Sequence, residues 1–357
     1  MVPELGLVEQ KLHIKRGSDI VKVAILGVGR MGRRHIQAAR KLGLDLVAVF
    51  DASPESLRLT QEEQDLSDDH VFSDFDVMFA QTNPQCVIIA TTADFHCELT
   101  CRAVEKGAKF VLVEKPMAVS LEQCDRMLET CRRFGAKLAV NHQMRFMEQY
   151  TEPKRLFAME ACGGLASMTV VAGNFGFSMN GTHYFEAFRF LADEDPVEVT
   201  AWFSPGVVPN PRGAQFEDRA GCIRAVTASG KRLYMEIGAD QGHGVLAIYA
   251  CRNGMITVNE LTGELLSTER EEQYRKLPTT RYGMPSMDTR RAIQPAEVID
   301  TSAALLKALL HDVNSVSGED GRRVVELLVA AYESAERGNV PVRLDGKLDR
   351  SRVFPWA

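Results

Sequence analysis

The first part of the chain alternates between short hydrophobic runs and longer segments in which hydrophobic residues recur every three or four positions. Short, nearly uninterrupted apolar runs are typical of strands buried on both faces of a parallel sheet. The expected strands are Val21–Leu26, Leu44–Phe50, Cys86–Ala90, Phe110–Val113 and Lys137–Val140. The expected helices are Arg33–Leu42, His96–Lys106 and Ser120–Phe134, each followed by a glycine suited to end it. This alternation predicts an α/β unit with a doubly wound parallel sheet.

Near residue 141 the pattern changes to longer segments of alternating hydrophobic and polar residues, joined by glycine-containing turns. The expected strands are Ala166–Val171, Val197–Trp202, Gly221–Ala228, Lys231–Ile237, Gly244–Ala250 and Gly254–Asn259. The expected helices are Glu152–Ala161, His183–Leu191, Ala296–Leu310 and Gly321–Arg337. Such segments are typical of an α+β domain with one large, mostly antiparallel open sheet. A chain of 357 residues also exceeds the size of most single cores. We therefore expect an arm over residues 1–20, a first domain over 21–142 and a second over 143–357.

Three glycines directly follow the first hydrophobic run. Gly27 suits a tight turn from strand to helix, Gly29 allows backbone N–H groups to approach a pyrophosphate, and Gly32 allows the helix to pack closely on the sheet. Arg30 and Met31 lie between the last two glycines. The unpaired N–H groups at the start of the following helix favour a negative charge. The motif therefore predicts a Rossmann dinucleotide-binding domain.

Asp51 follows the second predicted strand and lies 19 residues after Gly32. A carboxylate at this place accepts hydrogen bonds from the ribose hydroxyls of the adenosine, and it repels the 2′-phosphate of NADP. The neighbours Ala52, Ser53 and Pro54 include no arginine, although Arg30 and Arg58 leave NADP open. We expect NAD as the preferred cofactor.

Composition limits the classes of function. The net charge of −6 argues against a general nucleic-acid or anionic membrane surface, and we found no apolar run of the length that a membrane span needs. The eight cysteines form no CxxC pair and have no nearby histidine cluster, so we expect reduced, mostly buried thiols and no metal site. These features predict a cytoplasmic protein that acts on small molecules.

Lys115 lies just after the strand Phe110–Val113, within the sequence Val113-Glu114-Lys115-Pro116. It is thereby expected at the carboxyl edge of the sheet, beside the nicotinamide, where an ammonium can donate a hydrogen bond to a reacting oxygen. A solvated surface lysine is the alternative interpretation.

The glycine motif, the triplet Glu114–Pro116 and the later segment Asn180–His183 together resemble the glucose–fructose oxidoreductase / inositol dehydrogenase / MocA (Gfo/Idh/MocA) family. The similarity includes the turn Ala90–His96 and the junction Asn141–Phe146. It extends to the segment Ser317–Arg323 and so spans most of the chain.

The resemblance implies a Rossmann domain and an α+β domain with NAD or NADP between them, and a homodimer or homotetramer formed through the open sheet. It implies sugars, nucleotide sugars or cyclitols as substrates.

Lys115 matches the active-site lysine, and the Lys115–Pro116 bond is a candidate cis peptide. His183 matches the histidine that serves as general acid and base; a helix cap is the alternative. Further residues at the cofactor are Thr91, His96, Glu114 and Pro116.

The chain departs from the family pattern at Met179, where many relatives carry an aspartate, so Tyr184 or Glu186 is a candidate to assist His183. Polar residues expected at the substrate are Asn141, His142, Arg145, Asn180, His183 and Tyr184. For Arg145, a fork toward an anionic group and an ion pair between domains remain open.

Three classes of function are compatible with these residues. The first is a dehydrogenase or reductase that interconverts a secondary hydroxyl and a ketone. The second retains NAD and uses transient oxidation for elimination, epimerisation or glycoside cleavage, without net NADH. The third is a regulator that binds the dinucleotide without catalysis.

Overall fold

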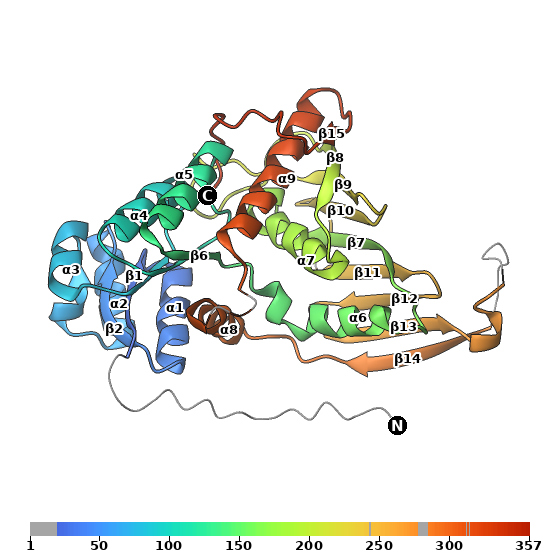
Figure 1. Ribbon diagram of the computed structural model, residues 1–357, viewed down its shortest axis with the longest axis horizontal. Coiled ribbons are helices and arrows are strands. Elements are labelled where there is room, and N and C mark those ends of the chain that lie inside the picture. The colour runs from blue at the N-terminus through green and yellow to red at the C-terminus, as the bar shows by residue number, and fades with distance from the viewer. Residues whose placement is uncertain (1–19, 243, 278–284, 312, 314) are drawn as a thin grey trace.

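A computed structural model describes residues 20–242, 244–277, 285–311, 313 and 315–357. The predicted arm therefore lies outside the described residues, except for Ile20. Two sheets organise the rest, one near each end of the molecule's longest axis (Figure 1). The predicted fold class is confirmed.

The first sheet is parallel and has six strands. Its order is β3 (Val71–Phe72), β2 (Asp45–Phe50), β1 (Lys22–Leu26), β4 (Cys86–Ile89), β5 (Phe110–Val113) and β6 (Lys137–Val140). All five predicted strands are present, and β3 is a sixth strand of two residues. The helices between the strands are α1 (Arg30–Lys41), α2 (Pro54–Gln64), α3 (Phe75–Thr82), α4 (Ala93–Glu105) and α5 (Leu121–Phe134). Ser120 caps α5, because its hydroxyl accepts a hydrogen bond from the N–H of Gln123.

The second sheet has nine strands. Its order is β14 (Ser286–Ala292), β13 (Glu264–Arg270), β12 (Gly254–Asn259), β11 (Val245–Cys251), β7 (Leu165–Gly173), β10 (Arg232–Gly238), β9 (Gly221–Thr227), β8 (Pro196–Phe203) and β15 (Val342–Arg343). Only β7 and β10 pair in parallel. The six predicted strands are present, whereas β13, β14 and β15 were not predicted.

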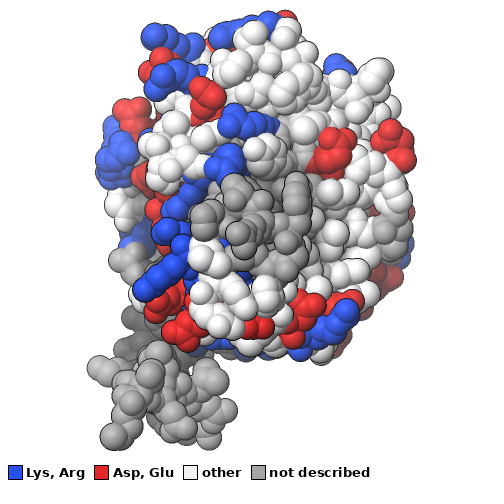
Figure 2. Space-filling view, turned by 90° about the vertical axis from the view of Figure 1, so that its right-hand side faces the viewer, with Lys and Arg blue, Asp and Glu red and all other residues white. Residues whose placement is uncertain are grey.

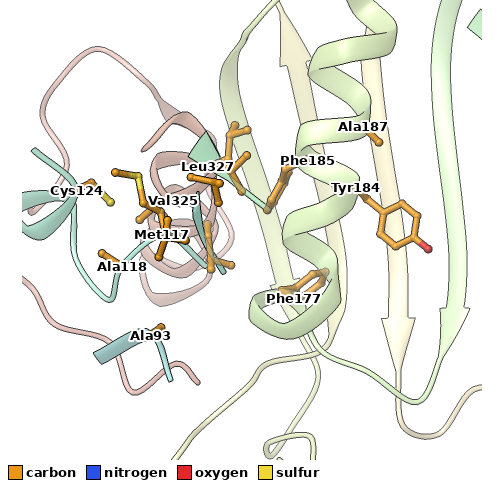
Figure 3. Close-up of a cluster of buried hydrophobic side chains, with 14 of the residues drawn as sticks. Ala93, Met117, Ala118, Cys124, Phe177, Tyr184, Phe185, Ala187, Val325 and Leu327 are labelled. Atoms are coloured by element: carbon orange, nitrogen blue, oxygen red, sulfur yellow. The ribbon is translucent and has the colours of Figure 1, made fainter. Parts of the chain in front are cut away.

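One face of this sheet is covered by α6 (Glu148–Ala158), α7 (Thr182–Ala192) and α9 (Gly318–Glu336) (Figure 1). Helix α9 packs on β8 and α7 and also contacts α5 and β6. Figure 3 shows Val325 and Leu327 of α9 between Met117, which follows β5, and Phe185 of α7. Helix α9 therefore joins the cores beneath the two sheets.

Helix α8 (Val298–His311) belongs to the later part of the chain but packs on α1 beside the parallel sheet. Its residues Leu305, Leu306 and Leu309 are buried with Ile36 of α1 and Leu112 of β5 in one apolar cluster. The later part of the chain therefore completes the core of the first sheet.

The opposite face of the nine-stranded sheet carries exposed apolar side chains. Val171 of β7 and Leu246 of β11 are paired in register, and they are 41% and 40% exposed. Trp202 and Met255 are exposed on neighbouring strands. Figure 2 looks onto the end of the molecule that carries β12–β14, where a band of Lys and Arg side chains runs beside Asp and Glu side chains. This end of the molecule therefore carries both positively and negatively charged side chains.

All eight cysteines are free, and six of them are buried. Within the described ranges, no helix has the length and apolar character needed to cross a membrane. The same residues contain no group of three or more His, Cys, Asp or Glu side chains arranged to hold a metal ion.

Candidate active site

The turn between β1 and α1 has space only for glycine at two positions. Gly27 has φ +86°, and a Cβ there would lie 2.7 Å from the backbone of Ala90 and Thr91. A Cβ on Gly32 would lie 2.0 Å from the carbonyl oxygen of Gly27. Gly29, in contrast, faces open space at the start of α1, where no side chain caps the helix. The N–H groups of the first turn are therefore available to an anionic group.

Asp51 follows β2 and lies beside this turn. Its Oδ2 accepts a hydrogen bond from the N–H of Val28 at 2.9 Å, and its Oδ1 accepts one from the N–H of Ser53 at 2.8 Å. These bonds hold the carboxylate while each oxygen keeps acceptor capacity for a ribose hydroxyl. Arg30 is exposed, and within the described part of the chain it has no ion pair. The glycine turn, the uncapped helix and Asp51 fit a dinucleotide.

Glu114 lies at the end of β5 in a buried hydrogen-bond network. Its Oε1 is 2.8 Å from Nε2 of His35 and 2.7 Å from Nδ2 of Asn141. Although burial raises the pKa of Glu114, hydrogen bonds from His35 and Asn141 and the charge of Lys115 lower it to about 2. Sequence reasoning missed His35, because a histidine in a helix gives no sign of a partner 79 residues away.

The Lys115–Pro116 peptide is cis, as predicted. His96 of α4 contacts this turn: Nδ1 lies 3.0 Å from the carbonyl oxygen of Pro116, and Nε2 lies 3.2 Å from that of Thr91. The ring thus joins the two turns predicted to line the cofactor. Burial lowers the pKa of His96. Both ring nitrogens face backbone carbonyl oxygens, and a neutral imidazole donates a hydrogen bond to only one of them at a time.

Lys115 reaches from the first sheet to the second part of the chain, where its Nζ donates a hydrogen bond to the backbone carbonyl of Met179. Burial lowers the pKa of Lys115 to about 8, and Arg212 and Arg30 act in the same direction, whereas Glu114 and Asp218 oppose it. A fraction of the lysine is therefore neutral at mildly alkaline pH.

The carbonyl of Met179 belongs to a π-helical turn, Phe177–Gly181, directly before α7. Asp218 holds this turn, because its carboxylate accepts hydrogen bonds from the N–H groups of Ser178 at 2.7 Å and Met179 at 2.9 Å. The Asp218 side chain is fully buried. A Cβ on Gly176 would lie 2.3 Å from the carboxyl carbon of Asp218, so glycine is needed there. Sequence reasoning missed Asp218, which lies on an irregular loop without a recognisable motif.

His183 is the second residue of α7, directly after the π-helical turn. It lies against His142, which follows β6. The two Nδ1 atoms are 3.4 Å apart, and the rings meet at 87°. Burial and the charge of Lys115 lower the pKa of His183 to about 3. Burial also places the pKa of His142 well below its ordinary value. Both imidazoles are therefore neutral near pH 7.

The other predicted substrate residues have different surroundings. Arg145 forms an ion pair with Glu186, which also pairs with Arg189 at 2.7 Å. The Tyr184 hydroxyl donates to Glu260 at 3.0 Å. Glu186 and Tyr184 thus have partners other than His183. Arg145 forms an ion pair, but Glu186 lies in the same predicted domain, 143–357, so this pair does not cross the predicted domain boundary. The side chain of Asn180 is half-buried.

Residues 21–142 match the model of an oxidoreductase family with an NAD-binding Rossmann fold. An inositol 2-dehydrogenase from Saccharopolyspora erythraea is 26% identical over 346 residues, which cover 91% of this chain and 96% of the relative. The chain belongs to the Gfo/Idh/MocA oxidoreductase family. Residues 21–142 form its NAD-binding Rossmann fold.

Other relatives match over shorter segments. A 2,7-anhydro-N-acetylneuraminate hydratase from Mediterraneibacter gnavus is 33% identical over 137 residues, 38% of this chain and 35% of the relative. For two inositol dehydrogenases the match covers 40% and 58% of the relative. The chain therefore matches from about a third to just over half of the length of these relatives.

A solved structure shows the same fold over nearly the whole chain. An oxidoreductase from Agrobacterium radiobacter, in complex with NAD+, L-tartaric acid and magnesium, has a TM-score of 0.77 at 19% identity. The alignment covers 92% of this chain and 100% of that one. Both parts of the chain therefore share their fold with that structure.

Proposed function

We propose that this protein is an NAD-dependent oxidoreductase that interconverts a secondary hydroxyl and a ketone on a sugar-like substrate. The observation that carries the proposal is the meeting of Lys115, from the nucleotide-binding sheet, with the π-helical turn that precedes His183. An ammonium and an imidazole thus come from two parts of the chain, and the charge of Lys115 helps to lower the pKa of His183.

In this proposal, His183 accepts the proton of the substrate hydroxyl during oxidation and returns it during reduction. Its low pKa keeps the imidazole neutral and able to accept a proton. Lys115 donates a hydrogen bond to the same oxygen and stabilises negative charge that develops there. NAD, when bound, accepts or supplies the hydride.

Asp51 supports NAD over NADP. Its carboxylate is held beside the glycine turn by two backbone N–H groups, where the 2′-phosphate of NADP would meet a negative charge. Gly29 and the uncapped start of α1 receive the pyrophosphate.

The substrate class is supported by polar atoms near His183 and by the names of relatives. His183 is 8% exposed and the side chain of Asn180 is half-buried, and substrate hydroxyls are natural partners for such polar groups. Relatives are named for inositol and for D-apiose, both of which carry several hydroxyls.

We also propose that two or four copies associate through the open face of the nine-stranded sheet. The exposed, register-paired Val171 and Leu246, with Trp202 on the same sheet, support this assembly. We further propose that the two domains divide at residue 142 and that the protein is cytoplasmic. The free state of all eight cysteines supports a reducing compartment.

The first experiment measures NADH and NADPH binding to the purified protein by fluorescence and then screens sugars, activated sugars, sugar acids and cyclitols with NAD. Growth of absorbance from NADH, with a ketone as product, is the expected result. Failure to bind either dinucleotide would refute the proposal.

Transient oxidation is the second candidate, favoured by the relative that is named a hydratase. It predicts product formation without net NADH. Product analysis by mass spectrometry, run beside the absorbance assay, separates the two candidates.

A further inference from the structure

His183 has one side-chain hydrogen-bond partner within the described ranges, and that partner is another imidazole. Nδ1 of His142 lies 3.4 Å from Nδ1 of His183, and the ring centroids are 5.2 Å apart. His142 is fully buried, and His183 is 8% exposed. Met179, four residues before His183 and thus nearly one helical turn away, offers no side-chain oxygen as an alternative acceptor.

Two neutral imidazoles can form this contact only with complementary tautomers. A neutral ring carries one N–H donor and one bare acceptor, so one Nδ1 must hold the proton and the other must be bare. The positive charges around His142 reinforce neutrality: Lys115 follows β5, Arg145 follows β6, and Arg189 lies on α7. The surroundings of the other ring nitrogen, Nε2, differ between the two histidines.

Nε2 of His142 is buried and has no hydrogen-bond partner among the described residues, whereas His183 keeps 8% of its surface exposed and its Nε2 is not among the buried, unpartnered atoms. Nε2 of His183 is therefore the nitrogen that a substrate can reach. To accept a hydroxyl proton it must be bare, and this requires the ring proton to be on Nδ1.

We propose that His142 is a positioning residue for His183: its bare Nδ1 accepts the Nδ1–H of His183 and thereby leaves Nε2 of His183 free to act as the base. This inference rests on the proposed function for its catalytic meaning, but the tautomer itself exists without substrate. In serine proteases a carboxylate fixes a catalytic histidine in the same way; here a second, neutral imidazole takes that place.

The decisive experiment observes the imidazole nitrogens directly. Protein labelled with 15N-histidine is studied by long-range 1H–15N correlation, with His183 assigned by its loss in a His183→Gln variant. In the wild type we expect His183 as the Nδ1–H tautomer. In His142→Leu we expect its signals to shift toward the Nε2–H form, and in His142→Asn, whose amide oxygen can still accept, we expect the wild-type tautomer. An Nε2–H form of His183 in the wild type, or no change in His142→Leu, would overturn the inference.

A charge-altering variant tests the same contact by titration. His142→Asp keeps an acceptor and adds a negative charge, so the pKa of His183 should rise above the value in the wild type. An unchanged pKa would contradict the contact. The matched control is His70→Asn, which removes a partly exposed imidazole that contacts Ser67 and lies far from His183 in the sequence. This variant should leave the His183 signals unchanged. Thermal melting and NADH affinity confirm that each variant is folded.

Kinetics separate this inference from the proposed function. Once a substrate is known, His142→Leu should lower kcat on the order of 10- to 100-fold, the range seen for residues that orient a functional histidine, with KM little changed. His142→Asn should recover most of that loss. The proposed function stands if the wild type turns over substrate and Lys115→Ala does not. If His142→Leu nevertheless keeps the wild-type kcat, His142 has no positioning role. If no dinucleotide binds, the proposed function fails, and the tautomer result is unaffected.

Discussion

The Nζ of Lys115 donates a hydrogen bond to the backbone carbonyl of Met179, 64 residues further along the chain. Asp218 in turn accepts hydrogen bonds from the N–H groups on the same turn. A single turn of backbone therefore connects the lysine to a buried carboxylate without direct contact between their side chains. This relationship makes the geometry at Lys115 depend on three distant segments of the chain.

Replacement of Lys115 by alanine should remove the donor to the reacting oxygen. We expect kcat/KM to fall on the order of 100- to 1,000-fold, as for loss of one oxyanion donor, while NADH affinity changes little. Steady-state kinetics and fluorescence titration measure the two quantities. Lys106→Ala, on an exposed lysine after α4 that pairs with Asp76, is the matched control. Turnover at the wild-type rate would remove Lys115 from the mechanism.

The pH dependence of kcat/KM should show a descending limb near pH 8. Burial lowers the pKa of Lys115 to about 8, so the ammonium that donates the hydrogen bond is lost as the pH rises through that value. The pKa of His183, about 3, keeps the base form present from about pH 5 upward. Lys115→Arg keeps the positive charge and should abolish the limb at a reduced rate. A limb that persists in Lys115→Arg would assign it to another group.

Replacement of Asp218 by asparagine should loosen the turn that carries Met179. Asparagine retains one acceptor, so one of two buried N–H groups loses its partner, at a cost of about 1–3 kcal/mol. Because Asp218 raises the pKa of Lys115, the alkaline limb should also move to lower pH. Thermal melts and the pH profile check both effects. Asp240→Asn, in an exposed turn, provides the comparison.

Glu260 should make stability depend on pH. Its carboxylate accepts hydrogen bonds from Tyr150 at 2.6 Å and Tyr184 at 3.0 Å, and burial raises its pKa to about 7. The native state then holds a proton that the unfolded state releases between about pH 4.5 and 7, so stability falls as the pH rises through this window.

The variant Glu260→Gln lacks this titration. The melting temperature of the wild type should therefore decline relative to that of Glu260→Gln between pH 5 and 7.5. Glu264→Gln, an exposed residue paired with Arg290, should melt in parallel with the wild type over the same range. Parallel curves for Glu260→Gln would show that the carboxylate titrates normally.

Asp51→Ala should weaken NADH binding and narrow the preference over NADPH. The variant loses an acceptor for the ribose and a charge that repels the 2′-phosphate, and we expect the ratio of the two Kd values to change on the order of tenfold. Fluorescence titration with both dinucleotides measures it. An unchanged ratio would mean that another group selects the cofactor.

The sequence predicted the parallel sheet well because each buried strand is a local apolar run, and the glycine turn and Asp51 follow from the positions of those strands. It did not predict β13 and β14, because Glu264–Arg270 and Ser286–Ala292 are largely polar and lack a clear alternation. Their strand structure comes from pairing with neighbours that occur elsewhere in the chain.

The candidate site likewise contains residues that the local sequence predicts and residues that it does not. Lys115 was located by its place at a strand end, a property of local sequence. Asp218 and His35 were missed because their roles depend on backbone or side-chain groups 40 and 79 residues away. Long-range hydrogen bonds leave no periodic signal in the sequence, so only the folded chain reveals them.

The position of α8 limits how this architecture can be divided. Leu305, Leu306 and Leu309 cover Ile36 and Leu112, although they follow eight of the nine strands of the second sheet in the sequence. A fragment that stops at residue 142 would expose that apolar surface to water. Recombination that transplants the nucleotide-binding portion into another scaffold must therefore bring a matching helix from the recipient's distal region, and chimaeras without one should aggregate.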